Sequence, residues 1–221
     1  MERTTIVPFA VYDYRKDVRN VIIMPEIRSR FLRMEPGEVA VRHSHDLGQE
    51  VFLILEGQCE FEIEGEYAVL GPGQMCFADA NQMHRVRTIG DQPMTMYLSV
   101  TPHIEPTHTF WDDQGNRLPP RYGGATVNER AARTEQTEPL ADLLARHVAA
   151  AKALAASAAS AATAQESGSA ALTAALEAGD TAAAKAAVDD MSETMVQAYT
   201  AIRDLGAAWN EIAVTVAEPS R

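Results

Sequence analysis

Two histidines and one glutamate stand close together in HSHDLGQE, residues 43–50. Side chains two residues apart on a β-strand point to the same face, so His43 and His45 are expected to point the same way. Residues 46–49 suit a turn, after which Glu50 begins the next strand-like run. If these strands pair, the three side chains converge. Two neutral imidazoles and a carboxylate suit Fe(II), Mn(II), Ni(II) or Zn(II).

A second stretch, GEYAVLGPGQMCFADANQMHRV, supplies a fourth candidate ligand, His84, eleven residues after Gly73. On a strand, His84 and Val86 share one face and Arg85 takes the other. His84 is therefore expected on the same face as an apolar residue.

The elements that carry these residues are expected to be strands. Before residue 134 the chain holds most of its glycines and aromatic residues, and several short runs alternate with period two. In CEFEIEGEY, Cys59, Phe61 and Ile63 fall on one face and glutamates on the other. The run EVFLILEG is apolar on both faces, as in a strand buried between two layers. Short strands separated by turn residues predict a β-sandwich or barrel, so this part is mainly β.

The sequence after residue 134 is rich in alanine and predicts helices. A first helix is expected to begin with Thr137 as its cap and Pro139 in its first turn, and to end at Gly168. The segment SAALTAALEAG then predicts a small extra helix. Asp180 is expected to cap a long helix with an apolar stripe. Together these elements predict an antiparallel, alanine-rich α-helical hairpin.

Three parts of the chain follow from these patterns. We assign residues 1–102 to the β-barrel with an N-terminal extension and residues 134–221 to the helical hairpin. The proline-rich segment 103–133 has no periodicity and is too aromatic for a plain linker, so it is expected to pack on the barrel.

The first stretch resembles the cupin superfamily. From Gly37 to Gly57 it reads G-x5-H-x-H-x4-E-x6-G, which matches the first motif of that family at every defined position. The second stretch departs from the family pattern at Gly71, Gln74, Asp79 and Asn81. Asn81 stands where glycine is frequent, and asparagine tolerates positive φ. The resemblance covers about residues 20–102.

The resemblance implies a double-stranded β-helix, the jelly-roll barrel of cupins. It also implies that His43, His45, Glu50 and His84 hold one divalent transition metal, Fe, Mn, Ni or Zn. Members with this ligand set include dioxygenases acting on enolic compounds, so the function expected is a metal-dependent dioxygenase acting on an enol, a diol or a carboxylate. Two alternatives stay open, namely a non-redox isomerase, decarboxylase or lyase, and a ligand-binding sensor.

The barrel interior is expected to be apolar with one charged end, the usual form of a small-molecule site. The residues expected to line it are Val39, Val41, Phe52, Ile54, Phe61, Ile63, Val86 and one face of the run 94–98. Four arginines, Arg28, Arg30, Arg33 and Arg42, surround it, and one is expected to face inward and hold an anionic substrate. The substrate-binding residues predicted are Arg42, Phe52, Phe61 and Tyr97. His103 and His108 are candidates for a catalytic role.

Charge and composition restrict the partners. A net charge of −12 argues against nucleic acid, which binds clustered Lys and Arg. No run approaches the ~20 apolar residues of a membrane span and no signal peptide is evident, so a cytoplasmic protein is expected. Cys59 and Cys76 form neither a disulfide framework nor a CxxC pair. The apolar stripe of the helical part predicts a homodimer or higher homo-oligomer.

Overall fold

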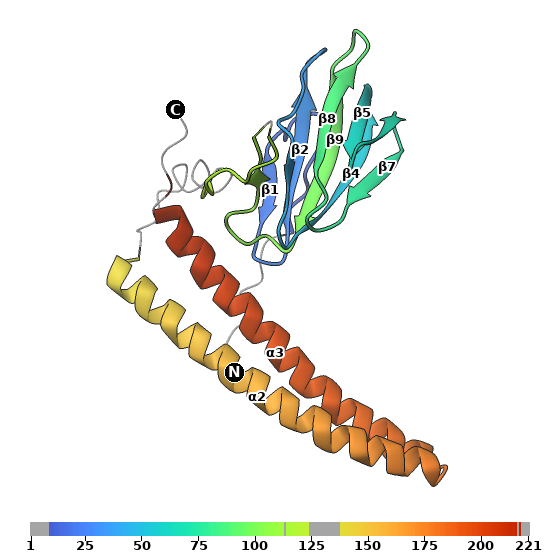
Figure 1. Cartoon of the computed structure of the whole chain (residues 1–221), viewed down its shortest axis with the longest axis vertical. Helices are drawn as coiled ribbons and strands as arrows, with labels where there is room; N and C mark the ends of the chain where they lie inside the picture. The colour runs from blue at the N-terminus through green and yellow to red at the C-terminus, as the bar shows by residue number, and fades with distance from the viewer. Residues whose placement is uncertain (1–8, 113, 124–137, 216, 218–221) are drawn as a thin grey trace. The chain divides into compact units, whose positions relative to one another are not determined.

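The computed structural model describes residues 9–112, 114–123, 138–215 and 217. The chain divides into two compact units, residues 1–121 and residues 122–221. Among the described residues, the first unit is built of strands and the second of two helices (Figure 1). The predicted class, mainly β followed by a helical pair, is confirmed.

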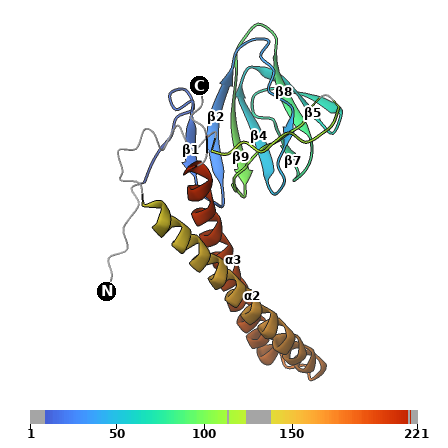
Figure 2. The same cartoon turned by 60° about the vertical axis from the view of Figure 1, so that its left-hand side comes forward.

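The first unit is a sandwich of two antiparallel five-stranded sheets within the described residues. The first sheet has the order β1-β2-β9-β4-β7 and the second β10-β3-β8-β5-β6. The strands are β1 (Asn20–Ile23), β2 (Arg28–Met34), β3 (His43–Ser44), β4 (Gln49–Glu56), β5 (Gln58–Ile63), β6 (Glu66–Leu70), β7 (Met75–Ala78), β8 (His84–Ile89), β9 (Met94–Thr101) and β10 (Thr109–Phe110). The strands β3 and β8, which carry His43 and His84, are neighbours in the second sheet, whereas β4, which carries Glu50, lies in the first. The candidate ligands therefore reach the interior from both layers of the sandwich (Figures 1 and 2).

The core between the sheets consists of the inward side chains of both layers. It contains Met34, Phe52, Ile54, Cys59, Phe61, Leu70, Ala78, Val86, Met94, Met96 and Leu98. The alternation expected for these strands is therefore confirmed. Val39 and Val41 are corrections, because they are 55% and 68% exposed. Ala40 lies between them, donates its N–H to the Val86 carbonyl and packs on the core, so period-two alternation turns both valines outward.

Two connections between strands need positive φ angles, which few residues other than glycine adopt readily. Glu64 and Gly65 both have positive φ, 50° and 82°, and join β5 to β6 by a two-residue hairpin turn. Gly57, between β4 and β5, has a φ of 72°. A Cβ at Gly57 would lie 2.3 Å from the carbonyl oxygen of Pro93 and 2.8 Å from the Cα of Met94. Backbone atoms cannot give way as a flexible side chain can, so this turn requires glycine.

Gly57→Ala is expected to destabilise the first unit by about 3 kcal/mol, combining about 1–2 kcal/mol of left-handed strain with overpacking of about 1–3 kcal/mol. Gly65→Ala is the matched control, since φ is 82° there but nothing lies within 4 Å of the added Cβ. It should cost about 1–2 kcal/mol, from strain alone. Urea unfolding of both variants measures the difference. Equal losses would show that the Pro93 contact is not tight.

The second unit is a pair of long helices, α2 (Leu140–Glu177) and α3 (Thr181–Thr215), which run side by side (Figures 1 and 2). The expected end of the first helix at Gly168 is wrong, and so is the small extra helix, because α2 continues unbroken to Glu177. A Cβ at Gly168 would lie 2.3 Å from the Cγ of Met191 on α3. Gly168 therefore permits close helix packing instead of ending a helix.

The turn between the helices agrees with the sequence. The Asp180 carboxylate accepts hydrogen bonds from the N–H groups of Ala182 and Ala183, as an N-cap does. The expected Thr137 cap lies outside the described residues. The buried positions of α3 are mostly small, whereas Val188, Tyr199 and Ile202 are exposed. Neither described helix is both long and apolar enough to cross a membrane.

Candidate metal centre

Four side chains from three strands and one loop converge inside the first unit. His43 lies on β3, Glu50 on β4 and His84 on β8, while His45 follows β3 directly. His43 and His84 are register partners on adjacent strands, and their rings are 4.4 Å apart. His45, Glu50 and His84 are each at most 3% exposed. His43 is the most exposed of the four, at 15%, so solvent approaches the group from its side.

The Glu50 carboxylate is the centre of the group. Its Oε2 lies 2.7 Å from Nε2 of His45, 3.3 Å from Nε2 of His84 and 3.9 Å from Nε2 of His43. One ligand atom from each residue lies within 4.8 Å of every other. The structure thus brings together all four side chains that the sequence singled out as ligands.

Backbone carbonyls orient all three histidines. The Nδ1 atoms lie 2.8 Å from the Val41 carbonyl for His43, 2.5 Å from the Thr107 carbonyl for His45 and 2.9 Å from the Gln82 carbonyl for His84. A carbonyl can only accept, so each Nδ1 donates its proton, and the other ring nitrogen, Nε2, faces Glu50. Such support is the usual way in which proteins orient metal-bound histidines.

The four donors fit a divalent metal ion. Donors about 2.1 Å from an ion lie about 3 Å apart when they are adjacent and about 4 Å apart when they are opposite. The separations of 2.7–3.9 Å from Glu50 lie close to this range. Three imidazole nitrogens and a carboxylate oxygen that face one another form a donor set that a divalent cation can bridge. The group could therefore hold a metal ion, and donors of this kind suit Fe, Mn, Ni or Zn.

Electrostatics hold Glu50 and His43 in the protonation states that a metal needs. Burial opposes ionisation of Glu50, but hydrogen bonds from His45 and His84 and the charge of Arg28 hold its pKa well below the usual range. Burial, followed by the neighbouring His84, lowers the pKa of His43 to about 4. At neutral pH Glu50 is therefore ionised and His43 is neutral.

The segment after β9 completes the surroundings of the group. β10 pairs with β3, with Phe110 opposite His43, so the preceding His108 lies against the site. The His108 ring is 4.8 Å from that of His43 and 4.9 Å from that of His45. Burial, and then the charge of Arg28, hold the pKa of His108 well below its ordinary value.

His103 lies behind the group and touches it through one residue. Its Nδ1 is 2.8 Å from the hydroxyl of Thr107, whose carbonyl receives the proton of His45. His103 is fully buried. His108 is therefore placed to meet a bound molecule, whereas His103 is placed to support His45.

The four predicted substrate residues fall in different places. Phe52 and Phe61 are buried with ring centroids 4.7 Å apart, and Phe52 lies 5.7 Å from the His84 ring, so they wall the site. Arg42 pairs instead with Glu62, at 3.3 Å, and is 44% exposed. The Tyr97 hydroxyl bonds to Ser29, and Tyr97 alternates with the inward Met96 and Leu98 of β9. The structure therefore does not bring Arg42 or Tyr97 to the four ligands.

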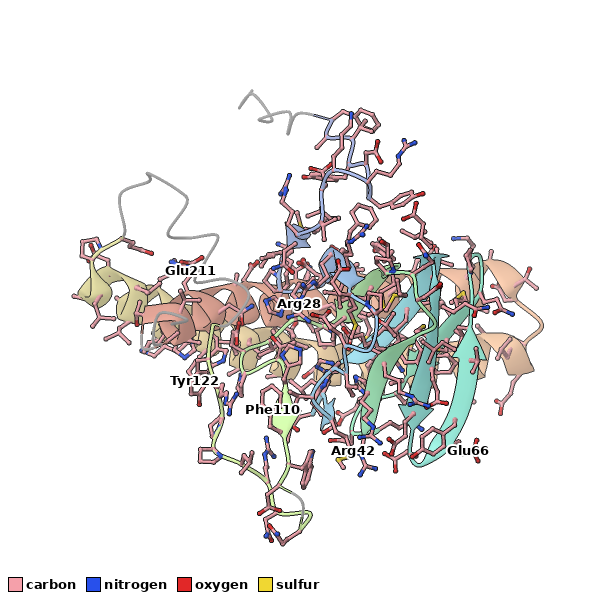
Figure 3. All side chains as sticks on the ribbon, turned by 90° about the horizontal axis from the view of Figure 1, so that it is seen from above. Arg28, Arg42, Glu66, Phe110, Tyr122 and Glu211 are labelled. Atoms are coloured by element: carbon pink, nitrogen blue, oxygen red, sulfur yellow. The ribbon has the colours of Figure 1, made fainter. Side chains whose placement is uncertain are left out.

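Arg28 is the buried one of the arginines that face inward. It is 3% exposed, and its Nη2 lies 3.9 Å from Oε1 of Glu50. Figure 3 shows Arg28 and Arg42 at separate points of the first unit. Alternation along β2 could have shown this from the sequence. Arg28 and Arg30 share a face with Leu32 and Met34, which are apolar.

A comparison with protein families assigns most of the strands and all four candidate ligands to one family. The family model described as the cupin domain matches residues 30–101, which include all four candidate ligands. This part of the chain is a cupin domain. The match does not include the helical unit. It also does not include His108 or the strand β10 that follows it.

Relatives of the cupin domain are distant. Polyketide synthase CurC of Streptomyces cyaneus is 30% identical over 69 residues, and the match spans 31% of this chain and less than half, 45%, of that relative. Among solved structures, DMSP lyase DddQ of Ruegeria pomeroyi is 26% identical over 42% of this chain and 46% of its own, with a TM-score of 0.37. KdgF of a Halomonas species is 22% identical over 40% of this chain and 79% of its own, with a TM-score of 0.38.

Proposed function

We propose that the cupin domain is a metal-dependent enzyme for a small molecule, and that its reaction is the dioxygenation of an enol, a diol or a carboxylate. The observation that carries this proposal is the buried convergence of three histidine Nε2 atoms on one carboxylate oxygen, with every Nδ1 bound to a carbonyl. Three carbonyls fix the orientation of the histidine rings whether or not a metal is bound. Burying these polar side chains without a ligand would be costly.

The surrounding residues favour chemistry centred on a metal. A bound redox metal with four protein ligands would leave positions that a substrate with two oxygen donors could fill or share with dioxygen. Phe52 and Phe61 offer no proton-transferring group and exclude water from one side. Burial raises the pKa of Cys59 and Cys76 to about 12, so neither thiol is a nucleophile at neutral pH.

A non-redox reaction, as in an isomerase, decarboxylase or lyase, is the second candidate, and the position of His108 favours it. A neutral imidazole beside His43 and His45 could accept a proton from a molecule held at the centre. In this alternative a bound metal would supply Lewis-acid chemistry, and His108 would act as the base. The two reactions therefore differ in whether His108 accepts a proton.

The dependence on oxygen decides between these reactions. The protein loaded with iron, manganese, nickel or zinc is assayed for oxygen uptake against enols, diols and small carboxylates. We expect turnover with a redox metal to fall by at least about 100-fold under strict anaerobiosis and to be absent with zinc. Turnover that is unchanged without oxygen, with zinc as active as iron, would remove the dioxygenase. His108→Gln would then be expected to abolish that turnover while leaving the metal content intact.

A further inference from the structure

Arg28 lies in one cross-strand row with the candidate ligand Glu50. Val100 of β9 is the register partner of Arg28 on β2 and also of Glu50 on β4. Register partners point to the same face of a sheet, and Val100 is fully buried. Arg28 and Glu50 therefore flank Val100 on the inner face of the first sheet, which places a guanidinium beside the metal centre.

Arg30 lies in the next inward row. Its partner is Leu98, and Leu98 is in turn the partner of Phe52, which walls the centre. Arg28 and Arg30 are two residues apart on β2, so both project into the same layer. The interior thus holds two guanidiniums on one side of the candidate ligands.

Within the part of the chain that the structure describes, each guanidinium has one donor without a partner. Both Nε atoms are buried, and neither has a hydrogen-bond partner among the described residues. The separation of 3.9 Å between Arg28 and Glu50 is too long for a hydrogen bond. Burial lowers the pKa of both arginines, and the charge of Arg28 lowers that of Arg30 further. Guanidiniums stay protonated at neutral pH, so a buried cation and a half-buried one lie close together, each with an unused Nε donor.

Metal binding would increase this positive charge. A divalent ion and two guanidiniums bring four positive charges, while Glu50 and Glu105, the carboxylates that act on Arg28, bring two negative ones. Two positive charges remain in a poorly solvated interior, where uncompensated charge is strongly unfavourable. An anionic molecule that reaches both the metal and the arginines would compensate them.

We propose that Arg28 and Arg30 form an anion subsite beside the metal centre, and that the substrate is a small acid whose carboxylate binds there while its other oxygen donors face the metal. The inference rests on the proposed function and names its substrate class. The planar fork of an arginine matches the two oxygens of a carboxylate, and the unused Nε atoms are part of that fork.

Malonate is the probe, because one carboxylate can meet the metal and the other the arginines. Calorimetric titration of the zinc-loaded protein with malonate is compared for wild type, Arg28→Gln and Arg30→Gln. We expect each substitution to weaken malonate binding by at least about tenfold, since losing one partner of a buried charged pair costs that much. Malonamide, which is neutral, should bind weakly and equally to all three.

Arg33→Gln is the matched control. Arg33 lies on the same strand, but it points outward and pairs with Glu35, so its loss changes the net charge without touching the interior. Its malonate affinity should stay within about twofold of wild type. If Arg28→Gln or Arg30→Gln fails to fold, Arg28→Lys and Arg30→Lys keep the charge without the fork and should show a smaller loss.

Metal content, measured first, separates this inference from the proposed function. If wild type holds zinc and both glutamine variants bind malonate as wild type does, the anion subsite is wrong and the metal enzyme stands. If wild type takes up no metal, the proposed function fails, and the metal-free protein is titrated instead. Weaker malonate binding that still depends on Arg28 and Arg30 supports the subsite there, and equal binding by all variants overturns it.

Discussion

Glu50→Gln is expected to lower the metal affinity of the cupin domain by at least on the order of 100-fold, since changes to outer partners alone cost about 10- to 100-fold. The substitution keeps the shape of the side chain but removes the only charged donor of the group. It also leaves the buried Arg28 without its nearest counter-charge. Both consequences oppose the entry of a divalent cation.

Elemental analysis after dialysis against a chelator measures this effect. Glu60→Gln is the control, because Glu60 pairs with Arg87 on the outer face of β5 and its loss changes the net charge equally. Glu60→Gln should keep the wild-type metal content. A folded Glu50→Gln protein that retains all of its metal would exclude Glu50 as a ligand.

The second large effect concerns acid. The metal-free protein is expected to lose stability as the pH falls from about 6.5 to about 4. Burial lowers the pKa of His43 and of His103 to about 4, whereas an unfolded chain holds histidine near 6.5. In this window the unfolded state binds more protons than the folded state, so acidification favours unfolding. Below about pH 4 these groups are protonated in both states and the loss is complete.

His103 offers the clearest measurement, because it is not a candidate ligand. A pKa difference of about 2.5 corresponds to about 3 kcal/mol. His103→Asn, which can still bond Thr107, should reduce the loss between pH 7 and pH 4 by about that amount. Urea unfolding in a Trp209→Phe background lets the fluorescence of Trp111 report the first unit alone. An unchanged pH dependence in His103→Asn would contradict a neutral, buried His103.

The four candidate ligands could be chosen from the sequence because His43, His45 and Glu50 follow local rules and the resemblance to cupins adds His84. Period-two alternation places His43 beside His45, and a short turn returns the chain at Glu50. Asn81, which stands where cupins often have glycine, has a φ of 66°, and its N–H bonds to the carbonyl of His45. The loop that carries His84 therefore keeps its form with asparagine.

Composition alone does not show which arginines face inward, because that depends on the face of the strand on which each one lies. Arg42 precedes the inward His43, so alternation turns it outward, where Glu62 holds it. Arg28 shares the face of Leu32 and Met34, but a buried arginine contradicts the rule that charged residues lie outside. Functional sites are where such rules are expected to fail.

Contacts distant in sequence could not be predicted at all. Thr107 reaches His45 across 62 residues, and Gly168 meets Met191 on the opposite helix. Glycine usually signals the end of a helix, and only the partner helix shows that this one makes room for a side chain. Neither contact can be recognised from the residue pattern of a single strand or helix.

The support of His45 by Thr107 has a consequence for the order of folding. The ligands themselves span residues 43–84, but the carbonyl that orients His45 belongs to the segment after β9. Closing a loop of this length costs conformational entropy before any contact is gained, so such contacts form late. During synthesis from the N-terminus, the strands up to β9 can pair before residue 107 leaves the ribosome. The ability to hold a metal is thus expected to appear as one of the final events in the maturation of the first unit.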